Sequence, residues 1–150
     1  MPIKGTQTVS TLNQSTVNIE RQNLWLSKNR YQTATFLNNT GAEAVFASGS
    51  LVLRDLTASE QIKPAIAGAT LVSVIGVLKT NMDGEVTLAD AETTPANYCI
   101  GGDLDASLLK LPTGVTLATV PTGAAKNLKD ILTDLGFVLF NVTEGTKFDN

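Results

Sequence analysis

The stretch from Ala69 to Ala89 constrains the fold of this chain more than any other. Residues 71–78 form a nearly unbroken apolar run rich in β-branched side chains, which favours a strand covered on both faces over a helix. The Asp83-Gly84 pair that follows has the composition of a tight turn. In residues 85–88 polar and apolar side chains alternate, as in a strand with one face in solvent. The stretch therefore predicts a β-hairpin whose first strand is central to a small β domain.

Further short strands are predicted on both sides of this hairpin. Their expected positions are Tyr31–Leu37, Glu43–Ala47, Leu51–Leu53, Tyr98–Ile100, Val115–Val120 and Phe137–Val142. The first two are expected to pair with each other across a turn at residues 38–41. Polar, Pro-containing or Gly-containing segments are expected to connect them at Leu56–Ile66, Ala91–Asn97 and Gly101–Asp103, and Leu104–Leu111 could form one or two helical turns. The pattern predicts a mainly β fold, a small β-barrel or sandwich-like domain.

One helix is expected, at about residues 126–135 in the C-terminal half. Its apolar residues recur at i, i+3, i+4 and i+7, which places them on one face: Leu128, Ile131, Leu132 and Leu135. Asn127 or Thr122 can cap its start, and Gly136 stands where a left-handed residue commonly ends a helix.

Residues 1–27 are predicted to form an extended N-terminal arm, and residues 28–150 a single β-rich domain. The arm is too polar to build its own core, yet it carries scattered apolar side chains. It can be an edge strand with a frayed end, or it can dock on another subunit. In the second case the partner-binding side chains are expected to be Ile3, Val9, Leu12, Val17, Ile19 and Trp25. As the single tryptophan, Trp25 could equally belong to the core.

Composition argues against several classes of function. The net charge is -3 and no basic cluster is present, so the electrostatic signature of a nucleic-acid-binding protein is missing. No apolar run approaches the roughly 18 residues needed to cross a membrane. The N-terminus lacks the apolar segment of a secretory signal, and Cys99 is the only cysteine, expected as a buried structural thiol. We therefore expect a soluble protein made in a reducing cytoplasm.

Candidate catalytic groups are few, because the chain has no histidine. Ser107 and Lys110 match an S-x-x-K pattern, but the companion motifs of the acyl-transfer enzymes that use it are missing. Asp103 and Asp105 form a carboxylate pair that supplies too few oxygens for calcium. We expect no catalytic site, no metal and no cofactor; a small hydrolase using these Ser/Lys or carboxylate groups is the alternative from another class.

The order of the parts resembles that of the head decoration, or cement, proteins of tailed bacteriophages. The resemblance rests on a polar N-terminal arm and on these segments: Gly49–Leu53, Ile62–Pro64, Ile75–Leu78, Gly84–Leu88 and, after a late helix, Gly136–Leu139. It implies a β-rich domain that forms homotrimers on the outer surface of the virion head. There it would bind the major capsid protein and stabilise the shell, after synthesis in the host cytoplasm. A base or collar module of a head fibre or tail is the alternative within this class.

Overall fold

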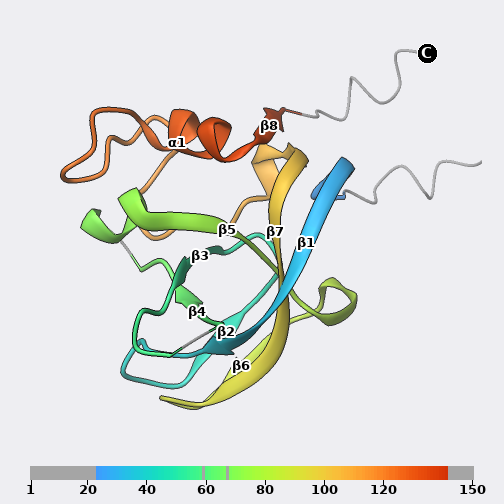
Figure 1. The fold of residues 1–150 in the computed structure, drawn as a ribbon, viewed down its shortest axis with the longest axis vertical. Coiled ribbons are helices and arrows are strands. Elements are labelled where there is room, and N and C mark those ends of the chain that lie inside the picture. The colour runs from blue at the N-terminus through green and yellow to red at the C-terminus, as the bar shows by residue number, and fades with distance from the viewer. Residues whose placement is uncertain (1–22, 59, 67, 142–150) are drawn as a thin grey trace, which may run out of the picture. The chain divides into compact units, whose positions relative to one another are not determined.

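The computed structural model describes residues 23–58, 60–66 and 68–141, and Figure 1 shows the arrangement of its elements. Residues 24–140 form one compact unit, which is the subject of the description below. Its strands are β1 (Trp25–Leu37), β2 (Ala44–Phe46), β3 (Leu51–Arg54), β4 (Gln61–Pro64), β5 (Val74–Lys79), β6 (Val86–Leu88), β7 (Thr93–Asp105) and β8 (Phe137–Phe140). Its helices are the 3-10 turns η2 (Gly68–Ser73), η3 (Asn81–Asp83) and η4 (Ala106–Leu108), and α1 (Leu128–Leu135).

Five of the strands close into a ring. The order is β1-β4-β3-β5-β7, and β7 pairs again with β1, so the hydrogen bonding returns to its start. The β1–β4 pair is parallel and the other pairs of the ring are antiparallel. Closure removes most of the exposed edges that an open sheet of this size would present. The prediction of a mainly β domain with one helix in its C-terminal half is confirmed.

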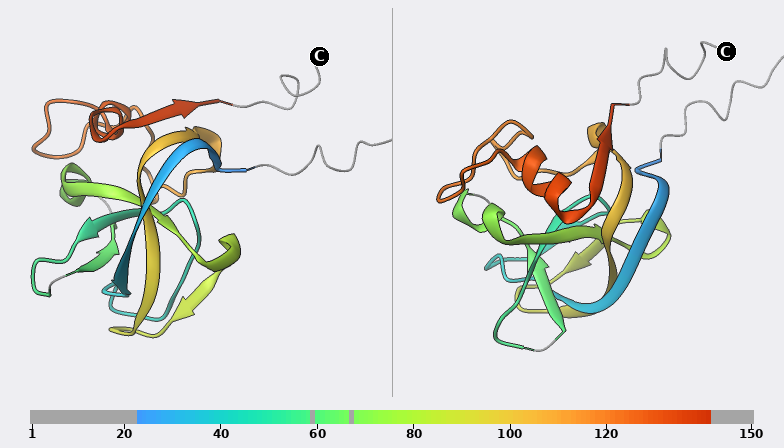
Figure 2. Two further views of the ribbon diagram at one scale, coloured as in Figure 1. Left: turned by 45° about the vertical axis from the view of Figure 1, so that its right-hand side comes forward. Right: turned by 45° about the horizontal axis from the view of Figure 1, so that its top comes forward.

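The longest elements of the barrel, β1 and β7, run side by side for most of their length (Figure 2). Their register shifts between Trp25 and Tyr31, where Lys28 adopts a positive φ of 57°. Gly102 of β7, with φ 127°, faces this irregular segment, and a Cβ there would lie 2.6 Å from Cα of Asn29. Only glycine lets the two backbones approach this closely.

Two apolar clusters fill the unit on different sides of the ring. The helix-side core joins α1 and β8 to the ring and contains Leu24, Trp25, Leu51, Leu53, Leu71, Val74, Val77, Cys99, Leu104, Leu109, Leu128, Leu132 and Phe137. The second cluster, which we call the hollow-side core because Phe36 and Leu78 also line a hollow described in the next section, contains Phe36, Phe46, Val52, Ile62, Leu78, Leu88 and Tyr98. Because successive residues of a strand point to opposite faces, β3 and β5 contribute to both cores.

The helix has the ends that the sequence predicts. Asn127 accepts a hydrogen bond from the Asp130 N–H at 2.9 Å, and Gly136 ends α1 with φ 108°. Leu128 and Leu132 are fully buried, as expected for the apolar stripe. The expected structural role of Cys99 also holds, since its side chain is fully buried.

The central hairpin prediction is wrong. Residues 68–73 form the turn η2, and the strand begins only at Val74. β5 pairs with β3 and β7, whereas β6 pairs with β2 in a separate two-stranded sheet. The apolar run and the alternating segment are both strands, but their partners come from distant parts of the chain. Likewise, β2 does not pair with the strand that precedes it.

Four other local predictions also fail. The expected connection at 56–66 contains β4, and β7 includes residues 93–97 of the expected connection at 91–97 and all of the expected turn at 101–103. Residues 115–120 form turns instead of a strand, stabilised by the Thr116–Thr119 contact. The predicted division into an arm of residues 1–27 and a domain of residues 28–150 stays a prediction, because residues 1–22 lie outside the described residues; β1 itself begins at Trp25.

Candidate functional site

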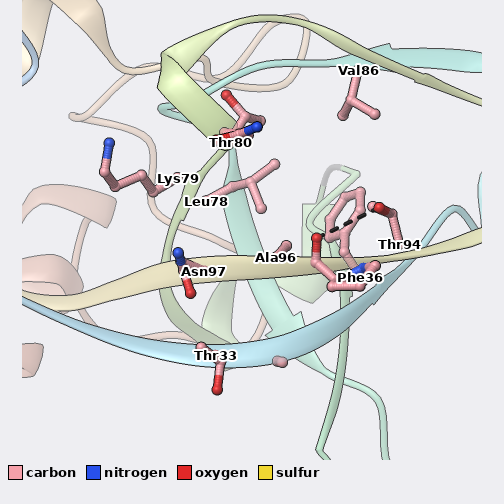
Figure 3. A pocket seen from close by; sticks show the side chains of 12 residues that line it. Thr33, Phe36, Leu78, Lys79, Thr80, Val86, Thr94, Ala96 and Asn97 are labelled. Atoms are coloured by element: carbon pink, nitrogen blue, oxygen red, sulfur yellow. Dashed lines mark hydrogen bonds between the residues drawn. The ribbon is translucent and has the colours of Figure 1, made fainter.

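The best-formed recess with an apolar floor is a hollow of about 460 Å³ between β6 and the first half of β7. Figure 3 shows Phe36, Leu78 and Val86 directed toward the same central space. Ala34 of β1 and Ala96 of β7 are paired across the two strands and also line the hollow. Because these two neighbouring positions carry only alanine, a recess is left above them, whereas Phe36 and Leu78 of the hollow-side core are themselves almost wholly buried.

The rim of this hollow is polar and carries a single charge. It is formed by Thr33, Thr80, Asn81, Thr94, Asn97 and Lys79. The ammonium group of Lys79 is already paired with Asp83 at 3.0 Å. The hollow thus combines an apolar floor with hydroxyl and amide groups around it, an arrangement typical of binding sites for neutral groups.

The hollow exists because β5 leaves β7 at Lys79. The β5–β7 pairing covers Cys99, Tyr98 and Asn97 and then stops. After the last pair the chain turns away from β7 at Thr80. The Thr80 N–H donates to Ser48 Oγ at 2.9 Å, and the Thr80 hydroxyl donates to the Gly84 carbonyl. In the described part of the chain, residues 93–96 of β7 therefore pair with β1 only, and β6 pairs with β2 only.

A strained turn borders the hollow. Met82 and Asp83 of η3 have positive φ values of 54° and 57°, which cost free energy in residues other than glycine. The Asp83 carboxylate fixes this conformation by accepting hydrogen bonds from Ser48 Oγ at 2.6 Å and Trp25 Nε1 at 2.9 Å, as well as from Lys79. The turn presents Met82 almost fully to solvent.

The electrostatics of this turn follow from the same contacts. Partial burial would raise the pKa of the Asp83 carboxyl, but the hydrogen bonds from Ser48, Trp25 and Lys79 outweigh it and lower the pKa below the ordinary value. Lys79 also lies over the rings of Trp25 and Tyr31, at 5.5 and 5.9 Å from their centroids. Burial, followed by the charges of Cys99 and Asp83, raises the pKa of Tyr31.

A second, more open recess of about 610 Å³ lies beside β3 and the loop after it. Arg54 donates to the Tyr98 hydroxyl at 3.1 Å, and this hydroxyl donates to Gln32 at 2.7 Å. Hydrogen bonds from the Thr57 backbone and hydroxyl, then from Gln61, lower the pKa of Asp55. The contacts of Asp55 with Thr57 and Gln61 stabilise the connection between β3 and β4, which is a structural role.

Three of the candidate catalytic side chains, Ser107, Asp105 and Asp103, are likewise engaged in structure. Ser107 Oγ donates to Asp105 Oδ1 at 2.7 Å, and this buried carboxylate caps η4. The Lys110 N–H donates to the Gly49 carbonyl, and in the described part of the chain no hydrogen bond joins Lys110 to Ser107. Asp103 accepts a hydrogen bond from Ser27 at 2.6 Å.

The described residues contain neither a candidate metal cluster nor a candidate membrane-spanning helix. Among residues 23–58, 60–66 and 68–141, no cluster of three or more His, Cys, Asp or Glu side chains could hold a metal ion. Within the same ranges, no helix combines the length and apolar character that a membrane span requires.

Five of the six predicted partner-binding residues lie outside the described residues: Ile3, Val9, Leu12, Val17 and Ile19. The sixth, Trp25, is 8% exposed and belongs to the helix-side core, in agreement with the alternative that the sequence left open. Its ring contacts Tyr31 edge to face at a centroid distance of 5.6 Å.

No sequence pattern indicated the hollow. Its alanines are unremarkable in a strand pattern, and residues 94–97 read as a connection because of Pro95. Comparison with known proteins adds no identification: no family model matches this chain, and no curated protein matches its sequence.

Proposed function

We propose that this chain is a structural virion protein that decorates and stabilises a phage head by bridging neighbouring major capsid subunits. The observation that carries the proposal is how the polar groups of the barrel are used. The buried carboxylates of Asp55 and Asp105 each bind the backbone and side chain of a residue two positions later. Asp83 joins three elements of the fold. Groups engaged in this way stabilise a rigid body and are poorly placed for proton transfer.

The surface chemistry supports the same proposal. The rim of the hollow consists mainly of Thr and Asn side chains, which can make hydrogen bonds without the large desolvation cost of charges. A contact that is weak in one copy gives high avidity when it is repeated over a lattice. The order of elements resembles that of the head decoration proteins. From this resemblance we propose the major capsid protein as the partner and a homotrimer as the assembly.

The test is binding to expanded, DNA-free heads of the virus that encodes the chain, measured by co-sedimentation. We expect full-length protein to bind and to raise the temperature at which the heads disrupt. A variant lacking residues 1–22 keeps Trp25 and the whole of β1 and is the matched comparison. We expect it to bind more weakly; equal binding would remove the arm from the mechanism, and no binding by either protein would refute the proposed function.

Cryo-electron microscopy of the virion tests the location. Density for the barrel on the outside of the head supports the proposal, whereas density at a fibre base or at the tail would favour the collar module. Both outcomes are distinguishable from enzymatic turnover, which Ser107→Ala or Asp103→Asn would abolish if the hydrolase alternative were correct.

A further inference from the structure

We propose that the hollow between β6 and β7 is the docking site for residues 16–20 of a second copy of this chain. The inference rests on the proposed function, in which copies of the chain associate on a shell, and it names the site at which they join. Three features carry it: the chemistry of the hollow, the open edge of β7, and the chain that lies outside the described residues.

The hollow has the chemistry to take an aliphatic side chain. Phe36 and Leu78 form a floor that is almost wholly buried, and Val86 closes one side. The cross-strand pair Ala34 and Ala96 leaves the space above it open. A Val or Ile side chain placed there would cover the exposed parts of Val86, Ala34 and Ala96, and burial of apolar surface is the main source of affinity at such sites.

The open edge of β7 can accept a strand. An antiparallel strand that continues beyond the last β5 pair, Lys79 with Asn97, would lie opposite Ala96, Pro95 and Thr94. Pro95 has no N–H, so at this position the edge can accept a main-chain hydrogen bond but cannot donate one. Strand addition at a sheet edge supplies main-chain hydrogen bonds, and pockets for alternate side chains supply specificity. The hollow lies directly beside this edge, so one extended segment can use both.

Residues 16–20, Thr-Val-Asn-Ile-Glu, match this requirement in sequence. Val17 and Ile19 alternate with polar residues, so an extended segment would direct both aliphatic side chains to one face. The chain outside the described residues is 22 residues long at this end. Only residues 21 and 22 separate the segment from Asn23, so at roughly 3.3 Å per residue its near end stays within about 10 Å of Asn23. The neighbouring barrel must therefore place its hollow beside the start of β1.

A second copy is the occupant that the positions along β7 favour. The segment joins the barrel at Trp25, which is paired with Leu104 near one end of β7, whereas the hollow lies at Thr94–Asn97 toward the other end. An arm at one position and its receptor at another make a head-to-tail contact between copies. Contacts of this kind close into rings when the rotation permits, and the proposed homotrimer is such a ring.

The test is sedimentation equilibrium of full-length variants. The double variant Val17→Asp/Ile19→Asp alters the segment, and Ala96→Leu fills the hollow; we expect each to weaken self-association about tenfold or more. Thr6→Asp/Thr8→Asp carries the same charges at the same spacing elsewhere in the arm and is the matched control for the first. Ala125→Leu adds the same side chain at an exposed position and is the control for the second. Both controls are expected to associate as the unaltered protein does.

Mixing the Val17→Asp/Ile19→Asp variant with the Ala96→Leu variant shows whether the segment docks in the hollow of a second copy or in the hollow of its own chain. One partner keeps an intact hollow and the other an intact segment, so a mixture is expected to form a complex of one copy of each. If the mixture stays monomeric although each separate variant has lost association, the segment docks in its own chain or elsewhere, and the inference is overturned. If Ala96→Leu lowers the folding cooperativity, Val86→Asp replaces it.

Self-association and shell binding fail separately. An unaltered protein that remains monomeric at millimolar concentration overturns this inference, yet it leaves the proposed function open to the head-binding assay. Conversely, a protein that associates through the hollow but does not bind heads refutes the proposed function and retains the docking site.

Discussion

Replacing Asn38 by alanine tests how the turn after β1 is stabilised. This side chain is fully buried and lies where the end of β1 meets the end of β6. Its amide group donates to the carbonyls of Ala42 at 2.8 Å, Leu88 at 3.0 Å and Ala89 at 3.1 Å. Its oxygen accepts hydrogen bonds from the N–H and hydroxyl of Thr40 at 3.0 and 2.8 Å. The substitution removes all of these interactions together.

The expected loss follows from the contacts. A hydrogen bond contributes about 1 kcal/mol net, and two amide hydrogens and two accepted bonds are lost, which gives about 4 kcal/mol. Part of this loss is recovered because Thr40 is exposed and can bind water instead. The buried Leu88 carbonyl cannot recover its bond so easily. We therefore expect the free energy of unfolding to fall by about 3 kcal/mol.

Urea unfolding followed by the fluorescence of Trp25 measures this change, because the single tryptophan is buried in the folded protein. Asn39→Ala is the matched control, since Asn39 is the adjacent residue of the same type and is exposed. It is expected to change the free energy of unfolding by less than about 0.5 kcal/mol. If Asn38→Ala and Asn39→Ala unfold at the same urea concentration, the hydrogen bonds of Asn38 do not stabilise the fold and the reasoning is refuted.

Three further predictions concern single groups. The pKa of Asp83 is lowered in the folded protein, so the stabilisation by its carboxylate is present above the ordinary pKa of 3.8 and is lost as the pH falls through the folded pKa. The difference in unfolding free energy between the unaltered protein and Asp83→Asn should therefore shrink as the pH falls below 3.8. A difference that stays constant over this pH range would contradict the assignment. Asn127→Ala should lower the free energy of unfolding by about 1 kcal/mol in urea, because it removes the N-cap of α1, and Lys126→Ala is the exposed comparison. The Cys99 thiol should react with a thiol reagent only as fast as the barrel opens, so urea should accelerate the reaction, and an immediate reaction in native buffer would show that the thiol is accessible.

The features that the sequence predicted correctly depend on neighbouring residues. The stripe of α1, its Asn127 cap and its Gly136 end lie within ten positions. The turn after β1 begins at Asn38, whose side chain binds residues two and four positions later. Each of these signals is complete within one window of sequence, so a local pattern is sufficient to identify it.

The failed predictions concern pairing between distant segments. The alternation in residues 85–88 was interpreted correctly as a strand, but its partner β2 lies about 40 residues earlier. β7 contains Pro95 and two adjacent glycines, which locally indicate turns. Gly102 is instead required by the close approach of β1 near Asn29. Only the pairing across the barrel explains these residues, and a single sequence does not show it.

The hollow was invisible in the sequence for the same reason, and this bears on function. A catalytic site can often be recognised in a sequence by its residue types, since proton transfer and metal binding need particular side chains. A docking site of this kind needs only small residues beneath a space and a strand edge that ends early, and both arise from the departure of β5 at Lys79. Ala34 and Ala96 have significance only as a pair across two strands. If the chain joins copies and binds a lattice, as we propose, these functions need no distinctive residue types, and the geometry of the edge of β7 is the better guide to its partners.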